Sequence, residues 1–292
     1  MPELPEVETI RRGLFSCCLN KKIVQVKVYS EKSFIGPVET VIGASIRDVR
    51  RRGKALLIDL SNDVTVMIHL RMTGQLIWEP LASAGERFAG VEERFAGGHP
   101  SESFVEELPN KQTRVEIVTD GGTLFFNDQR KFGFIKPIPT EEVEEDKFIA
   151  SLGPEPWDAN IDDFYAILQR RKGSPIKAVI LDQKVVAGIG NIYADEALFY
   201  AGVKPGRRAG EVTREEAGKI IEGAEKVMRK SIDSGGSTMA TYVKTDGTRG
   251  DYLDLFAQVF RREGKECLRC GGEIIKTRVA GRGTHYCPEC QK

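Results

Sequence analysis

The sequence predicts an α+β chain of several domains, with a β-rich first part, a helical second part and a cysteine-rich tail. Three observations carry this prediction. Apolar residues alternate with polar ones, or form short runs bounded by turn residues, over residues 21–135. Beyond residue 139 the apolar residues recur at helical spacing. Two Cys-x-x-Cys pairs then lie in the tail.

An amphipathic helix is expected at the amino terminus. Four apolar residues recur there at helical spacing: Leu4, Val7, Ile10 and Leu14. Pro5 suits the first turn, and Glu6 and Glu8 lie at the positive end of the helix dipole. Cys17 and Cys18, near the end of this helix, are expected to be free thiols.

Strand-like segments follow this helix. Valines alternate with polar residues over 24–28, and apolar runs over 54–60 and 64–70 are separated by Ser-Asn-Asp. Residues 114–118 and 123–126 flank an Asp-Gly-Gly turn. Adjacent strands joined by such short turns predict an antiparallel β half.

The remaining segments define the domain limits. Residues 79–110 lack any periodicity, which indicates a long surface insertion. Apolar stripes over 161–168 and 217–228 predict helices, and the second opens with a Thr213-x-x-Glu216 capping box. A Pro-rich, acidic stretch between the two halves predicts a hinge. The expected division is a β domain at 1–136, a linker at 137–150, a helical domain at 151–260 and a ribbon at 261–292.

The overall composition is that of an ordinary globular protein. The chain has 292 residues, about the length of two domains, and 40% of them are hydrophobic. No stretch approaches the roughly 18 consecutive apolar residues that a membrane span needs, and no secretory leader is recognisable. We therefore expect a cytoplasmic protein without a membrane partner.

Charge is balanced overall but segregated along the chain. With 43 basic and 43 acidic residues the formal net charge is zero, which excludes a uniformly basic coat for nucleic acid. It does not exclude a basic groove, because binding depends on where the charge lies. Basic clusters occur at 11–12, 50–52, 170–172, 207–208 and 261–262. Such clusters are usually solvated faces, so they indicate a polyanionic partner only together with other features.

The tail contains a predicted zinc site. Cys267-x-x-Cys270 and Cys287-x-x-Cys290 are separated by 16 residues, a spacing at which two knuckles present four thiolates to Zn²⁺. A reducing compartment favours metal ligation over disulfides. Because sulfur fills all four positions, we expect one structural Zn²⁺. Gly271-Gly272 after the first pair and Gly281-Arg282-Gly283 before the second leave room for a two-stranded hairpin with Arg282 near its tip.

The amino terminus contains a candidate nucleophile. Removal of Met1 would make Pro2 the terminal residue, and a terminal amine titrates near about pH 8, so part of it is uncharged at neutral pH. A secondary amine that attacks an aldehyde-level carbon gives a charged iminium, which promotes elimination at the neighbouring carbons. Glu3 and Glu6 are carboxylates close to this amine that could move protons. A simple amphipathic helix explains the rest of the segment.

This segment, Pro2-Glu-Leu-Pro-Glu-Val-Glu-Thr9, resembles the amino-terminal signature of the formamidopyrimidine-DNA glycosylase family. Further motifs follow in the family's order: His69-Leu-Arg-Met72-Thr-Gly, Asn127-Asp-Gln-Arg130-Lys-Phe132-Gly, Leu152-Gly-Pro-Glu-Pro, Ile176-Lys177 and Gly188-Ile-Gly-Asn191-Ile-Tyr-Ala-Asp-Glu196. The resemblance covers nearly the whole chain. It implies an antiparallel β-sandwich with an N-terminal helix, a helix-two-turns-helix domain and the zinc ribbon. It also implies a monomeric enzyme that removes 8-oxoguanine and ring-opened purines from double-stranded DNA.

The resemblance assigns catalytic roles to four residues. Pro2 would attack the anomeric carbon of the damaged nucleoside, and β- and δ-elimination would then leave a one-nucleotide gap. Glu3 would protonate the opening sugar, and Glu6 would fix the helix start and the amine. Lys54 would hold the phosphate near the lesion.

The resemblance also assigns DNA contacts. Met72, Arg130 and Phe132 would fill the void left by the extruded base, for which a flexible apolar plug, a planar cation and a ring are suited. Lys177 would lie near the damaged nucleotide. Asn191 and Arg282 would contact the backbone, and the loop at 237–252 would close over the extruded base.

Three departures and three alternatives accompany this interpretation. Gln112 stands where the family often has His, Phe260-Arg-Arg-Glu-Gly264 replaces a more usual Tyr-Gly-Arg-x-Gly, and the insertion at 79–110 is long and acidic.

The nearest alternative is an endonuclease VIII-like glycosylase for oxidised pyrimidines. A catalytically inert, zinc-dependent binder of damaged DNA is the second, and a protein-interaction ribbon is the third.

Overall fold

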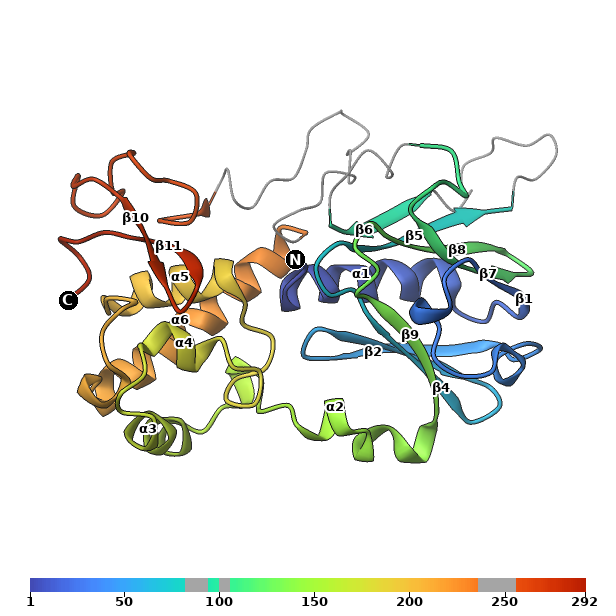
Figure 1. Cartoon of the computed structure of the whole chain (residues 1–292), viewed down its shortest axis with the longest axis horizontal. Helices are drawn as coiled ribbons and strands as arrows, with labels where there is room; N and C mark the ends of the chain where they lie inside the picture. Colours follow the sequence, from blue (N-terminus) through green and yellow to red (C-terminus); the bar gives the residue numbers. More distant parts are fainter. Residues whose placement is uncertain (82–93, 100–105, 236–255) are drawn as a thin grey trace. The chain divides into compact units, whose positions relative to one another are not determined.

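The computed structural model describes residues 1–81, 94–99, 106–235 and 256–292. These residues form two compact units (Figure 1). The first consists chiefly of Met1–Ala150, and the second of Ser151–Ser234 together with the described residues after 255.

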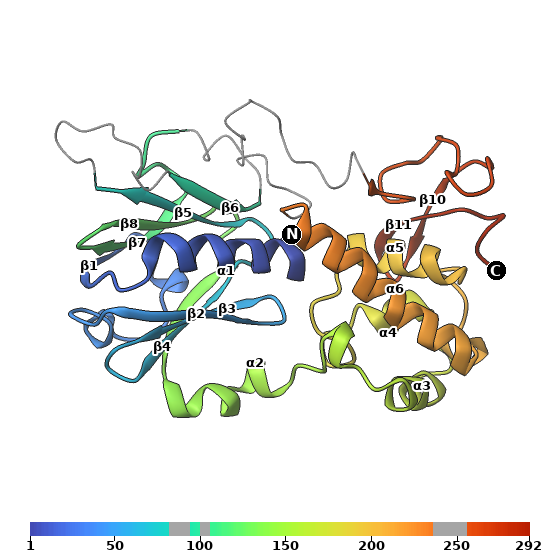
Figure 2. The same cartoon turned by 180° about the vertical axis from the view of Figure 1, so that it is seen from behind.

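The first unit contains two antiparallel sheets with helix α1 (Leu4–Cys18) between them (Figures 1 and 2). The five-stranded sheet has the order β1 (Ile23–Val28), β7 (Thr113–Thr119), β8 (Gly122–Asp128), β5 (Gly74–Pro80) and β6 (Phe95–Gly98). The four-stranded sheet has the order β2 (Ile46–Arg52), β3 (Ala55–Leu60), β4 (Val64–His69) and β9 (Phe134–Pro139). The predicted antiparallel β domain with its amino-terminal helix is confirmed.

The apolar stripe of α1 anchors this helix to both sheets. Ile10 and Leu14 are 1% and 0% exposed, and the same core contains Leu56 of one sheet and Trp78 and Phe126 of the other. Fully burying side chains of this size stabilises the fold by about 1.5–3 kcal/mol each. The start of α1 is therefore held firmly, which positions the amino terminus.

Strand β6 corrects the prediction of a surface insertion over all of 79–110. Phe95–Gly98 pairs with β5, with Ile77 opposite Ala96. A four-residue Phe-Ala-Gly-Gly strand has no periodicity to detect, and Gly97 is needed because a Cβ there would lie 2.4 Å from Cγ1 of Ile10. The rest of the insertion, 82–93 and 100–105, lies outside the described residues.

The interval expected to be a linker contains regular elements. After β9, a 3₁₀ helix η4 (Thr140–Glu145) and helix α2 (Lys147–Ala150) complete the first unit. Shorter 3₁₀ turns are η1 (Glu31–Ser33), η2 (Val38–Thr40), η5 (Pro156–Asp158) and η6 (Ala209–Glu211).

The second unit is helical apart from its hairpin. Its helices are α3 (Ile161–Arg170), α4 (Ile176–Ile180), α5 (Asn191–Ala201) and α6 (Arg214–Asp233). Thr213 and Glu216 form the predicted capping box of α6. Helix α5 is apolar on most sides and central, yet it contains two buried carboxylates, Asp195 and Glu196, at 0% and 1% exposed. Buried charges require partners.

The tail forms the predicted hairpin of β10 (Ile275–Val279) and β11 (Arg282–Tyr286). Its turn residues, Ala280 and Gly281, have positive φ angles of 50° and 74°. Two successive left-handed residues are the backbone of a type I′ turn, whose twist matches the strands. Arg282 follows this turn directly, so it lies near the tip as predicted.

Candidate functional site

The amino-terminal residues are arranged around a capping box. Oε2 of Glu6 accepts the backbone N–H of Glu3 at 2.8 Å, and Glu3 is the N-cap of α1. The two residues are 4% and 2% exposed, and Pro2 is also buried. The expected role of Glu6 at the start of the helix requires this hydrogen bond. While Met1 is attached, the Pro2 nitrogen is an amide and not a nucleophile.

Lys54 and Arg71 place two positive charges near His69. Lys54 occupies the two-residue Gly53-Lys54 turn between β2 and β3, and it is 6% exposed. Burial and the positive charges of Arg71 and Lys54 lower the pKa of His69 to about 3, so the imidazole is neutral at pH 7. Nδ1 of His69 accepts the backbone N–H of Arg71 at 3.0 Å, which leaves the ring proton on Nε2. Two cations beside a neutral donor favour an anionic ligand.

The three predicted void-filling residues lie in loops of the first unit. Met72 is half-buried in the loop between β4 and β5, and Arg130 and Phe132 lie in the loop between β8 and β9. Phe132 is 56% exposed, and the guanidinium carbon of Arg130 lies 4.8 Å from its ring centroid. An exposed ring paired with a planar cation is available to contact a base.

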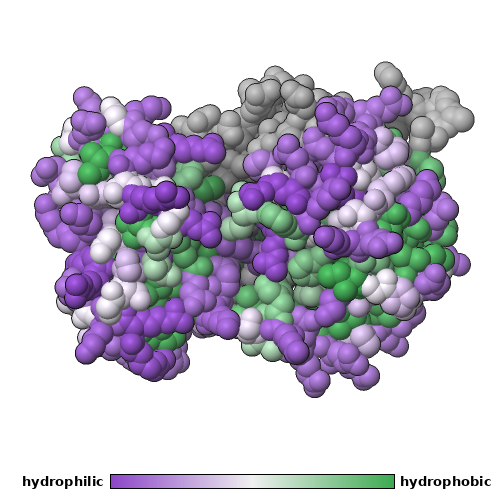
Figure 3. Space-filling model, viewed as in Figure 1, coloured by the Kyte–Doolittle hydropathy of each residue, from purple (hydrophilic) through white to green (hydrophobic). Residues whose placement is uncertain are grey.

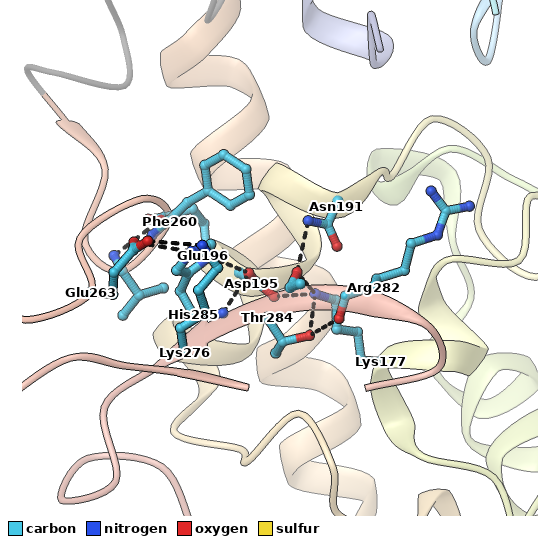
Figure 4. Close-up of polar contacts among 12 residues, drawn as sticks. Lys177, Asn191, Asp195, Glu196, Phe260, Glu263, Lys276, Arg282, Thr284 and His285 are labelled. Carbon is cyan, nitrogen blue, oxygen red and sulfur yellow. Dashed lines mark hydrogen bonds and ion pairs between the residues drawn. The ribbon is translucent and has the colours of Figure 1, made fainter. Parts of the chain in front are cut away.

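In the second unit, Lys177 is enclosed by protein (Figure 4). Its Nζ lies 2.6 Å from Oδ1 of Asp195, and it donates to Oγ1 of Thr284 at 2.8 Å and to the carbonyl of Gly283 at 3.2 Å. The side chains of Lys177 and Asp195 are both 0% exposed. The three protons of the amine therefore have three acceptors within the protein, and Lys177 joins α4 and α5 to the hairpin.

Asn191 and Arg282 lie beside this ion pair. Asn191 is the first residue of α5, and its Nδ2 donates to the carbonyl of Gly283 at 3.0 Å. Arg282 precedes Gly283, is exposed and projects away from the network in Figure 4. The start of α5 and the hairpin tip are thus fixed to each other, and both can present donors to an anion.

The buried acids of α5 were not identified as functional residues from the sequence. Oδ2 of Asp195 accepts the backbone N–H of His285 at 2.9 Å, and Nε2 of His285 lies 3.2 Å from Glu263. Glu263, one of the departures from the family pattern, also pairs with Lys276 at 2.8 Å.

Glu196 has a separate set of partners. Its carboxylate accepts the backbone N–H groups of Gln258, Val259 and Phe260 at 2.9, 3.0 and 2.9 Å. Burial raises the pKa of Glu196, although these hydrogen bonds act in the opposite direction. Two adjacent acids in an otherwise apolar helix are the sequence signal from which buried, hydrogen-bonded carboxylates could have been predicted.

The four tail cysteines form one cluster. Their sulfur atoms all lie within 4.8 Å of one another, with 3.9 Å between Cys267 and Cys290 and 3.5 Å between Cys270 and Cys287. Zn–S bonds of about 2.3 Å in a tetrahedron place sulfur atoms about 3.8 Å apart. The donor set and its spacing therefore fit one Zn²⁺ with no position left for water.

The loop expected at 237–252 to close over a base lies outside the described residues. In the part of the chain that is described, no helix has the length and apolar character needed to cross a bilayer. Hydrophilic and hydrophobic side chains are interspersed on the viewed face of each unit (Figure 3).

Comparisons with protein families match three segments of the chain. Residues 1–135 match the formamidopyrimidine-DNA glycosylase N-terminal domain, and residues 152–243 match the H2TH domain of the same enzymes. Residues 264–292 match a zinc finger found in FPG and IleRS. Together with the sulfur geometry, this match assigns one structural zinc to Cys267, Cys270, Cys287 and Cys290.

Curated relatives match this chain over its whole length. The formamidopyrimidine-DNA glycosylase of Pelotomaculum thermopropionicum is 38% identical over 299 residues, covering 100% of this chain and 99% of the relative. That of an Exiguobacterium species is 39% identical over 300 residues, covering 100% of both.

The fold of this chain is similar to that of solved structures of enzymes from the same family. The complex between Lactococcus lactis Fpg and DNA containing an abasic site has a TM-score of 0.83 and 31% identity, with full coverage of both chains. MutM in complex with DNA containing carbocyclic 8-oxo-G has a TM-score of 0.82, 31% identity and the same coverage.

Proposed function

Since the chain belongs to the formamidopyrimidine-DNA glycosylase family, we propose that it releases oxidised purines from double-stranded DNA and then cleaves the strand at the abasic site. It is a DNA glycosylase of base-excision repair. The observation that carries the proposal is the amino terminus, where Pro2 is followed by two buried acids in a capping box. We place the enzyme in the cytoplasm as a monomer.

The proposed chemistry begins when Met1 has been removed. The Pro2 amine attacks the anomeric carbon of the damaged nucleotide. The bond from this carbon to the base breaks, and the departing base takes the electron pair of that bond together with the proton that the amine loses. Glu3 donates a proton to the ring oxygen as the sugar opens, which leaves an iminium between Pro2 and the sugar carbon. Glu6 holds the backbone N–H of Glu3, so it orients the acid without giving up a proton.

Elimination follows from the charge on this iminium. Loss of a proton from the neighbouring carbon expels the 3′ phosphate, and a second elimination expels the 5′ phosphate. Water then hydrolyses the remaining iminium and restores the Pro2 amine. The positive charge on nitrogen is the electron sink in both eliminations, so no metal takes part in this proposal, and the zinc supports the ribbon.

The other predicted residues are proposed to bind and distort DNA. Lys54 would hold a phosphate near the lesion, and Asn191 and Arg282 would contact the backbone. Met72, Arg130 and Phe132 would occupy the space vacated by the extruded base, since extrusion costs a few kcal/mol that these contacts offset. The amine of Lys177 is enclosed, so its effect on the damaged strand would be indirect. Lys177 would hold Asp195 and the hairpin in place beside that strand.

Borohydride trapping tests the proposal. The processed protein is incubated with duplexes carrying either 8-oxoguanine or an oxidised pyrimidine, and the covalent adduct is measured by gel shift and intact mass. We expect a trapped adduct with the 8-oxoguanine duplex and much less with the pyrimidine duplex. The opposite preference would indicate an endonuclease VIII-like enzyme. Binding without any adduct would indicate an inert binder of damaged DNA, and a mass that includes Met1 would explain why.

A second prediction concerns the zinc ribbon. Cys287→Ser removes one ligand and should release zinc, disorder the tail and weaken DNA binding, because metal binding folds so small a ribbon. Zinc content and binding isotherms over a salt series measure these effects. Amino-terminal chemistry on a single-stranded abasic oligonucleotide should be preserved.

Arg282→Ala is the matched control for this variant. It should keep one zinc per chain and lower the slope of log affinity against log salt by about one unit or less, as expected for the loss of one phosphate contact. If both affinity and slope stay unchanged, the hairpin tip does not bind the backbone.

A further inference from the structure

We propose that Asp128 is a positioning residue that fixes the two void-filling loops to each other and so sets selectivity for the base opposite the lesion. The inference rests on the proposed role of Met72, Arg130 and Phe132. It adds a residue that contacts no DNA and acts through these three.

Asp128 is the last residue of β8 and is 0% exposed. Its Oδ1 accepts the hydroxyl of Thr73 and the backbone N–H of Arg130, the latter at 3.1 Å. Its Oδ2 accepts the backbone N–H groups of Phe132 at 2.9 Å and of Gly133 at 2.7 Å. Four donors thus satisfy one buried carboxylate, which is the condition for keeping a charge in the interior.

These four donors belong to two loops that are distant in the sequence. Thr73 directly follows Met72, and its hydroxyl oxygen also accepts the N–H of Arg130 at 3.1 Å. The Thr73 hydroxyl therefore donates to Asp128 and accepts from Arg130. These hydrogen bonds connect the residue next to Met72 with the backbone of Arg130, so they join the two void-filling loops to each other.

The loop after β8 needs such support. Lys131, between Arg130 and Phe132, has a φ of 56°, a left-handed conformation that is costly for a residue with a side chain. Gly133 cannot be enlarged, because a Cβ there would lie 2.8 Å from the ring of Phe126 and 2.9 Å from the carbonyl of His69. Arg114, 9% exposed, donates to the backbone carbonyl of Asp128 at 2.8 Å and places a cation behind the carboxylate. The carboxylate thus holds a strained turn in one geometry.

A fixed turn has a consequence for base selectivity. The guanidinium of Arg130 offers donors only, and an orphaned cytosine presents two adjacent acceptors, whereas an orphaned adenine presents one acceptor beside an amino group. A guanidinium held in place against Phe132 distinguishes these edges, while a mobile one adapts to either. Loosening the loops should therefore reduce discrimination more than it reduces binding.

The test compares Asp128→Asn with Thr73→Val, Arg130→Ala and the wild type. The substrates are duplexes with 8-oxoguanine opposite cytosine or adenine, and a single-stranded abasic oligonucleotide. Asparagine keeps the size of the side chain, but its NH₂ group replaces one of the two carboxylate oxygens. This group cannot accept the donors that face it, so at least one pair of hydrogen bonds is lost. Thr73→Val removes only the hydrogen bonds of the Thr73 hydroxyl that connect the two loops. The measurements are kcat/KM on each substrate and thermal unfolding.

We expect Asp128→Asn to lower kcat/KM on the cytosine duplex by about tenfold, the rate equivalent of one or two lost hydrogen bonds. The ratio of cytosine to adenine activity should fall as well, and Thr73→Val should show the same changes to a smaller extent. Cleavage of the single-stranded abasic site should stay within about twofold, because no void has to be filled there. A purely structural defect would lower this activity too.

Two outcomes would overturn the inference, and they differ. If Arg130→Ala loses discrimination while Asp128→Asn and Thr73→Val keep it, the void-filling role holds but Asp128 does not position the loops. If Arg130→Ala also keeps wild-type discrimination, the proposed void-filling role is itself wrong. Should Asp128→Asn fail to fold, Thr73→Val alone decides, because it leaves the carboxylate and its three backbone donors in place.

Discussion

Replacing Pro2 with glycine should lower strand cleavage by about two orders of magnitude or more, which corresponds to about 2.7 kcal/mol of lost transition-state stabilisation. Glycine still provides a terminal amine, but its imine is neutral unless it gains a proton, whereas proline forms an iminium that is always charged. The charged species is the better electron sink for elimination. Lesion binding should persist, because Pro2 is proposed to react and not to hold the DNA. Single-turnover cleavage and borohydride trapping measure the effect.

Pro5→Ala is the matched control for this variant. Pro5 is buried in the first turn of the same helix but has no terminal amine. Its replacement should leave cleavage near the wild-type rate, and any loss should follow thermal stability. If Pro2→Gly cleaves at the wild-type rate without a trapped adduct, the nucleophile lies elsewhere in the chain.

The features that the sequence predicted best are those determined by neighbouring residues. The cysteine cluster follows from two short spacings, and the structure brings all four sulfur atoms within 4.8 Å of one another. The capping box at Thr213 follows from a three-residue spacing, and the hairpin tip at Arg282 follows from the glycines beside it. Each of these is a local constraint on the backbone, so a single sequence contains it.

The features that it missed depend on partners far away in the chain. Asp195 is neutralised by Lys177 from α4 and bound by the N–H of His285 from β11, and nothing near residue 195 identifies either partner. The predicted DNA contact of Lys177 stays a prediction, but the amine is enclosed in the structure. Helical periodicity shows which positions are buried. It does not show which buried charges meet.

Asp128 has both neighbouring and distant hydrogen-bond partners. Three of its four donors lie within five residues, and an Asp before a loop of this kind is a common signal for local hydrogen bonding. The fourth donor, Thr73, is 55 positions away and becomes visible only when β5 and β8 pair, with Gly74 opposite Asp128. Sheet register, which the sequence leaves open, therefore creates the connection between the loops.

Glu3→Gln should abolish base release from 8-oxoguanine while sparing elimination at a pre-formed abasic site. Loss of a general acid typically costs about 10²–10⁴ in rate, and the first step is the one that needs the opening sugar protonated. An abasic site has already lost its base, and its open aldehyde reacts with the Pro2 amine directly. The amide keeps the size of the buried side chain and can still accept a backbone N–H, so the start of α1 should be preserved.

Glu8→Gln provides the comparison for the Glu3 variant. Glu8 lies on the same helix but pairs with Arg11, Arg12 and Arg51, so its loss should affect stability and not the division between the two steps. Rates on an 8-oxoguanine duplex and on an abasic duplex, measured in single turnover, separate base release from elimination. A Glu3→Gln variant that loses both activities equally would contradict the assigned role, because a residue needed for elimination as well cannot be acting only as the acid of the first step.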